Sequence, residues 1–128
     1  MSAGVEVELS LGGVATIVLN RPERSNAFDQ AMLNALAREF AARGADAATR
    51  VVVIRGAGKH FCGGADLVAR GMEPPPAPGQ VSLVDALAAL DRLPKPTIAV
   101  ARHAAPRWRR SVRRTARSGG NYDGPWRE

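Results

Sequence analysis

The sequence predicts an α/β domain, because short apolar strand patterns alternate with amphipathic helix patterns over residues 1–100. The first observation is a run of β-branched residues, Val51–Ile54, which is typical of a strand buried on both faces. The second is Gln30–Arg43, where apolar residues recur at helical spacing. The 128 residues, 45% of them apolar, suffice for one domain with a core.

Two strands are predicted at the start of the chain. Val5–Leu9 alternates apolar and charged residues, which is the period of a half-buried strand. Gly12-Gly13 is a hairpin turn signal, and Val14–Leu19 is the returning strand. The polar loop Asn20–Asn26 follows, where Pro22 prevents the strand from continuing.

The first helix is predicted over Gln30–Arg43. Asp29 is a good N-cap, and Gly44 is expected to end the helix as its C′ residue. The face expected to enter the core carries Met32, Leu33, Leu36 and Phe40.

The segment after the central strand is rich in glycine. Gly56 and Gly58 are expected to end the strand, and Gly63-Gly64 allows the backbone to approach a ligand closely. Asp66 stands where a helix N-cap would, so amides near Ala65 would lie at a positively polarised helix start. This arrangement predicts a binding site for a developing oxyanion.

A proline-rich loop is predicted over residues 71–80. Val81–Arg92 is predicted to form a second amphipathic helix, and Thr97–Val100 a short buried strand entered through Pro94 and Pro96.

Three motifs, in order, resemble those of the enoyl-CoA hydratase/isomerase (crotonase-like) family. They are Leu19–Ala27 (LNRPERSNA), Phe61–Leu67 (FCGGADL) and Leu93–Ala99 (LPKPTIA). The resemblance covers residues 5–101 and implies a crotonase-like ββα spiral, truncated to about its first two turns. The predicted domain boundaries are therefore 1–100 for this part of the core and 101–128 for a separate tail.

The resemblance also implies a function and site residues. The Ala65 amide, beside Gly64, would help to hold the oxygen of an acyl-CoA thioester. The residues implied in substrate binding are Arg21, Arg24, Asn26, Ala27, Ala65, Asp66 and Leu67. Coenzyme A would be part of the substrate, and no separate cofactor is expected.

Other chemistries have weaker support. Gly58-Lys59 lacks the remaining residues of a phosphate-binding loop. His60, Cys62 and His103 lack paired metal-ligand spacing, so no metal site is predicted. Cys62 as a nucleophile would need an activating base.

The tail departs from the family pattern. Where the family has a glycine run and then a helix, this chain has an arginine-rich segment without apolar periodicity. Residues 101–128 account for the whole net charge of +6, and their composition predicts disorder. One hypothesis is a reading-frame shift near residue 101. The alternative is a tail that binds polyanions such as nucleic acid, without sequence specificity.

These observations predict a protein that acts on or binds acyl-CoA but is incomplete as a catalyst, because the second oxyanion glycine and the catalytic carboxylates are missing. A non-catalytic acyl-CoA binder is the alternative. The single cysteine and the lack of a signal sequence predict a cytoplasmic protein that does not insert into membranes. Trimers or hexamers are implied for the intact family, but their helices are not expected in this chain.

Overall fold

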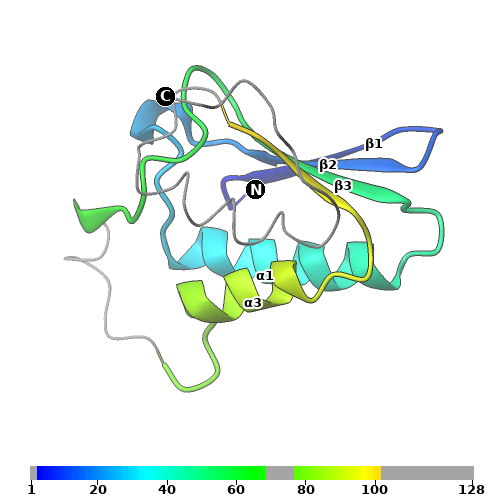
Figure 1. The fold of residues 1–128 in the computed structure, drawn as a ribbon. Coiled ribbons are helices and arrows are strands. Elements are labelled where there is room, and N and C mark those ends of the chain that lie inside the picture. The colour runs from blue at the N-terminus through cyan, green and yellow to red at the C-terminus, as the bar shows by residue number, and fades with distance from the viewer. Residues whose placement is uncertain (1–2, 69–76, 102–128) are drawn as a thin grey trace, which may run out of the picture.

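A computed structural model describes residues 3–68 and 77–101. Its four strands are β1 (Val5–Leu9), β2 (Val14–Leu19), β3 (Val51–Gly56) and β4 (Thr97–Val100). They form one sheet in the order β1-β2-β3-β4 (Figure 1). β1 and β2 are antiparallel, whereas β2–β3 and β3–β4 are parallel.

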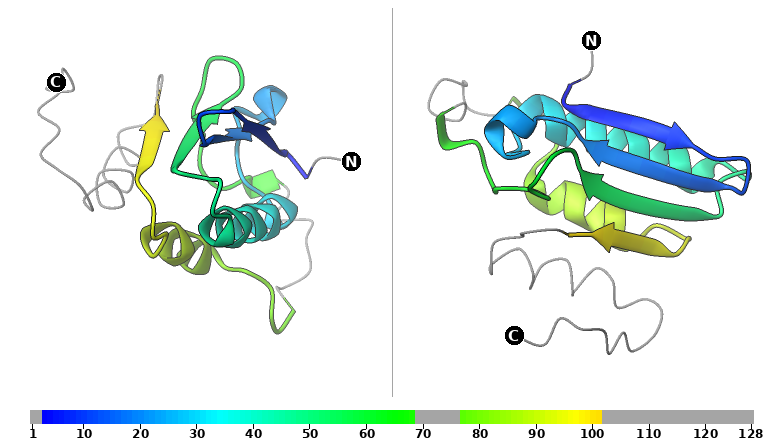
Figure 2. Two further views of the ribbon diagram at one scale, coloured as in Figure 1. Left: turned by 90° about the vertical axis from the view of Figure 1, so that its right-hand side faces the viewer. Right: turned by 90° about the horizontal axis from the view of Figure 1, so that it is seen from above.

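Two α-helices lie against one face of this sheet, α1 (Gln30–Ala45) and α3 (Leu83–Asp91). Figure 2 shows them side by side beneath the strands. A short 3₁₀ turn, η1 (Pro22–Arg24), lies in the loop after β2. None of the helices in the described residues is long and apolar enough to cross a membrane.

The core lies between the sheet and the two helices. Alternate residues of β2 and β3 point to the helices because strand side chains alternate between faces. Ile17, Met32 and Val52 are completely buried there. The predicted core positions of α1 are confirmed for Met32, Leu33 and Phe40, and Leu36 packs against this cluster while partly buried.

The sequence predicts the strands more accurately than the helix ends. The bounds of β1, β2 and β4 agree with the prediction, and β3 extends to Gly56. The predicted helix end at Gly44 is wrong, because α1 runs to Ala45 with Asp46 as its C-cap. Gly44 instead permits close packing: a Cβ there would lie 3.2 Å from Leu93 Cδ2.

The helices cover only one face of the sheet in the described part of the chain. On the other face Val53 is half-buried and Ile98 is 53% exposed. The expectation that Val51–Ile54 is buried on both faces is therefore wrong. The expectation of a buried strand at Thr97–Val100 is also wrong, since Val100 is 41% exposed as well. The predicted loop at residues 71–80 is described only from residue 77, and the predicted tail lies beyond the described residues except for Ala101.

Candidate functional site

The candidate site is built on a short parallel bridge between Phe28 and Ala65. Phe28 N donates to Gly64 O at 2.9 Å, and Asp66 N donates to Phe28 O at 2.9 Å. Phe28 is fixed because its side chain is buried in the core. Asp29 holds the next position, since its carboxylate caps α1 by accepting from Met32 N at 2.9 Å.

This bridge determines where the Ala65 amide points. The peptide bonds of the described residues are all trans, and in a trans peptide the C=O and N–H point in opposite directions. Gly64 O points to Phe28, so the N–H of Ala65 points away from it. No residue that the structure describes accepts a hydrogen bond from this N–H. The donor is therefore oriented and open to an acceptor from a ligand.

Gly64 makes this chain path possible. Its φ is +107°, in the region that residues with a Cβ rarely adopt. The glycine expected from the sequence to allow a close approach is thus required by the backbone conformation itself.

Arg21 holds the two sides of the bridge together. Its Nη1 donates to Ala27 O at 2.7 Å and lies 3.4 Å from Asp29 Oδ2. Its Nη2 donates to Asp66 Oδ2 at 3.1 Å. The Arg21 side chain is only 17% exposed, and the Asp66 side chain is 5% exposed. Removing one partner of an ion pair as buried as this one is costly, because the other charge would be left without its partner.

Arg24 also contacts Asp66, but from a more open position. Its Nε lies 3.3 Å from Asp66 Oδ2, and its side chain is 44% exposed. The structure therefore separates the two arginines that the sequence groups together: Arg21 is enclosed, and Arg24 reaches solvent.

Asn26 joins three backbone segments around the site. It is completely buried, and its φ is +54°. Its Oδ1 accepts from Arg21 N at 2.8 Å, and its Nδ2 donates to Ala57 O at 2.9 Å and His60 O at 2.7 Å. These contacts tie the loop after β2 to the loop after β3, a role that sequence reasoning did not find because the partners lie far along the chain.

The remaining predicted site residues lie close by but differ in environment. Ala27 contributes its carbonyl to Arg21, as described above. Leu67 is 78% exposed and follows Asp66 at the beginning of a helical turn. Asp66 thus occupies the position expected of an N-cap.

Cys62 has no feature of a nucleophile. It is buried, and burial raises the pKa of its thiol. The Cys62 Sγ lies 3.9 Å from Gly64 O. In the described residues no cluster of three His, Cys, Asp or Glu side chains could hold a metal ion.

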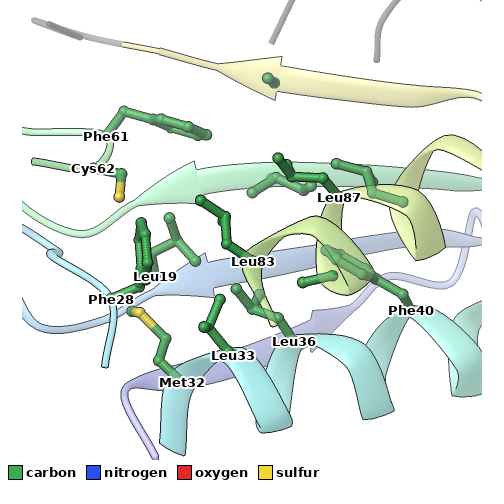
Figure 3. A pocket seen from close by; sticks show the side chains of 14 residues that line it. Leu19, Phe28, Met32, Leu33, Leu36, Phe40, Phe61, Cys62, Leu83 and Leu87 are labelled. Atoms are coloured by element: carbon green, nitrogen blue, oxygen red, sulfur yellow. The ribbon is translucent and has the colours of Figure 1, made fainter. Parts of the chain in front are cut away.

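An apolar cavity of about 80 Å³ lies beneath the site, between the sheet and the helices. Figure 3 shows side chains from β2, α1, α3 and the Phe61-Cys62 segment around it. Its lining is almost entirely carbon and sulfur, so it offers no partners to a buried water.

Known proteins share this sequence and architecture. A sequence profile described as Enoyl-CoA hydratase/isomerase matches residues 10–106. An enoyl-CoA hydratase of Alternaria alternata is 38% identical over 97 residues, which cover 76% of this chain and 32% of that protein. A 1,2-epoxyphenylacetyl-CoA isomerase of Escherichia coli is 39% identical over 92 residues, which cover 67% of this chain and 35% of that protein. This chain therefore spans about a third of the length of these relatives.

Solved structures agree. An enoyl-CoA hydratase of Mycobacterium marinum matches with a TM-score of 0.69 at 32% identity, over 77% of this chain and 47% of that one. An enoyl-CoA hydratase/isomerase of Pseudoalteromonas atlantica matches with a TM-score of 0.68 at 28% identity, over 77% of this chain and 38% of that one. The predicted fold class, a fragment of this α/β fold with a mixed sheet and two helices, is confirmed.

Proposed function

Because this chain belongs to the enoyl-CoA hydratase/isomerase family, we propose that it binds acyl-CoA thioesters, with the Ala65 N–H donating to the thioester oxygen. The observation that carries this proposal is the oriented Ala65 amide, which has no acceptor among the described residues. A donor fixed in advance stabilises developing negative charge by about 3 kcal/mol in other oxyanion holes.

Binding without efficient turnover is the proposed outcome for this chain. Where the resemblance implies a glycine run with a second oxyanion donor, this chain has the arginine-rich segment 101–128. With one donor, the thioester oxygen would be held, but the carboxylates of the described site, Asp29 and Asp66, are engaged by Arg21 and are not placed to act as bases. Hydratase or isomerase activity is therefore proposed only for an intact relative.

Arg24 is the proposed contact for a coenzyme A phosphate. Its side chain reaches solvent and contacts Asp66 through Nε, so its terminal nitrogens can bind an incoming anion. Arg21 is proposed to stay in place, because leaving would break its bonds to Ala27 and Asp66. Asn26, through its side-chain amide, and Ala27, through its backbone carbonyl, would then support the substrate loop without direct contact to the ligand.

The cytoplasmic location also remains a proposal. One relative, a protein of Arabidopsis thaliana 38% identical over 65 residues, is named as peroxisomal.

The test compares two ligands that differ in one oxygen. Butyryl-CoA carries the thioester carbonyl, and S-butyl-CoA, a thioether, lacks it. Titration of ¹⁵N-labelled full-length chain should shift the Ala65 amide resonance with the thioester and leave it in place with the thioether. Arg24→Gln should weaken both ligands equally, and more at low salt than at high salt. Absence of binding, or equal Ala65 shifts with both ligands, would contradict the proposal.

A further inference from the structure

We infer that Arg21 is a positioning residue for the Ala65 amide, acting as a clamp across the Phe28–Ala65 bridge. The inference deepens the proposed function and rests on it for its catalytic meaning. Its structural part stands on contacts that do not depend on any ligand.

The first step is that the bridge is small. Among the described residues, backbone hydrogen bonds join the segments at three places: Phe28 N to Gly64 O and Asp66 N to Phe28 O, both 2.9 Å long, and Gly63 N to Ser25 O at 2.8 Å. It lies outside the four strands, so no longer ladder holds it in register. Such a short pairing is easily opened unless other contacts support it.

The second step is that one guanidinium contacts both segments. On the Phe28 side, Nη1 bonds the carbonyl of Ala27 and lies near the carboxylate of Asp29. On the Ala65 side, Nη2 bonds the carboxylate of Asp66. The flat, two-pronged geometry of arginine allows this double contact, and a lysine ammonium on a flexible stem does not reproduce it.

The third step is that the position of Arg21 is itself constrained. Its backbone N–H donates to Asn26 Oδ1 at 2.8 Å. Its side-chain stem passes over Gly4, where a Cβ would lie 2.6 Å from Arg21 Cγ. Arg21 is therefore held at its base by Gly4, the residue before β1, and by the buried Asn26.

The consequence is a direct link between Arg21 and the open donor. When the Gly64 carbonyl leaves Phe28 N, the Gly64–Ala65 peptide plane can rotate, and the Ala65 N–H turns with it. Loss of the Arg21 contacts should thus change the direction of the Ala65 N–H more than it changes the sheet.

The test is amide hydrogen exchange on the full-length chain. Arg21→Lys keeps the positive charge but removes the guanidinium group that contacts both segments. It should speed amide exchange at Phe28 and Asp66 by about tenfold or more, while the exchange rates of amides in β2 and β3 stay unchanged. Arg55→Lys is the matched control, because Arg55 forms an exposed pair with Glu8 at 3.0 Å on the sheet. This control should leave Phe28 and Asp66 unchanged.

Asp66→Asn serves as a second variant in case Arg21→Lys does not fold. It keeps an oxygen acceptor but removes the charge that holds the guanidinium, so the same two amides should respond. If both variants speed exchange uniformly across the sheet, or if neither affects Phe28 and Asp66 more than Arg55→Lys does, the inference is overturned.

A second measurement tests whether Arg21 affects the hydrogen bond between the Ala65 amide and the ligand. The carbonyl stretch of ¹³C-labelled butyryl-CoA should move to lower frequency on binding to the wild-type chain, and by less in Arg21→Lys. If the wild-type chain shows no shift, the proposed function fails, while the exchange result still decides whether Arg21 orients the amide.

Discussion

Lys95 caps the carboxyl end of α1 from a distant part of the chain, since its Nζ donates to the carbonyl oxygen of Arg43 at 2.7 Å. The same ammonium also donates to the carbonyl of Asp46. A cation at this end of a helix satisfies carbonyls that have no partner within the helix and interacts favourably with the helix dipole.

We therefore expect Lys95→Met to lower the free energy of unfolding by about 2 kcal/mol, because it keeps the apolar stem but removes a charged donor. Chemical denaturation followed by circular dichroism measures this. Lys59→Met is the control, because Lys59 is exposed, and it should change stability by less than about 0.5 kcal/mol. Equal effects of the two changes would show that the cap is not stabilising.

Lys95 also shows where sequence reasoning ends. The motif Leu93–Ala99 identifies the family, but nothing in its spacing shows that its lysine binds the end of α1. Strand bounds follow from local apolar alternation, so β1, β2 and β4 could be predicted well. The partners of Arg21 and Asn26 could not, because they lie on loops that only the folded sheet brings together.

The wrong prediction of a helix end at Gly44 has a different cause. A glycine at the end of an apolar pattern usually marks a helix end, and this one instead makes room for Leu93. Tertiary packing overrode the local signal.

Replacement of Asn26 by alanine should be strongly destabilising. Arg21 N, Ala57 O and His60 O would lose their partner in a buried place, and alanine would have to adopt a φ of +54°. We expect a loss of about 3 kcal/mol, measured by denaturant unfolding. Ser25→Gly is the control at the neighbouring residue, whose φ is +53°, and it should be neutral or stabilising. A loss below about 1 kcal/mol for Asn26→Ala would contradict the role given to its side chain.

The pKa of the Asp46 carboxyl group should depend on the hydroxyl group of Thr49. The Thr49 hydroxyl donates to Asp46 Oδ2 at 2.7 Å, and this bond, with the Ala48 amide, lowers the pKa of Asp46. Thr49→Val should raise this pKa towards its ordinary value of 3.8, as measured by NMR titration of the side-chain carbon. Asp85 is the internal control, because its pKa is lowered by Ser82 and should stay where it is.

The sign of the pH effect follows from the lowered pKa. A group whose pKa is lower in the folded state stabilises the fold above its unfolded value and loses that contribution as the pH falls. Wild-type stability should therefore fall more than that of Thr49→Val as the pH falls from about 5 through the ordinary value of 3.8 and on through the lowered pKa of the folded state. Parallel pH profiles would contradict the assignment.

The apolar cavity should accept additional carbon atoms. Ala99 of β4 lines it, and valine is favoured in strands. Since each additional buried CH₂ group contributes about 0.8 kcal/mol, Ala99→Val should raise the free energy of unfolding by about 1 kcal/mol. Thr16→Val, on the opposite face of β2, controls for the effect of a branched side chain in this sheet. Destabilisation by Ala99→Val alone would indicate that the cavity has no space for two methyl groups.

The parallel pairing of β2 with β3 determines the order in which this chain can fold. The β1–β2 hairpin can form early, since its strands are joined by a tight turn. β2 meets β3, and β3 meets β4, only after a loop and a helix have crossed between them, and closing such long loops is slow. The Phe28–Ala65 bridge needs the first of these crossings. The open amide is thus assembled late, and in refolding it should mature after the hairpin has already formed.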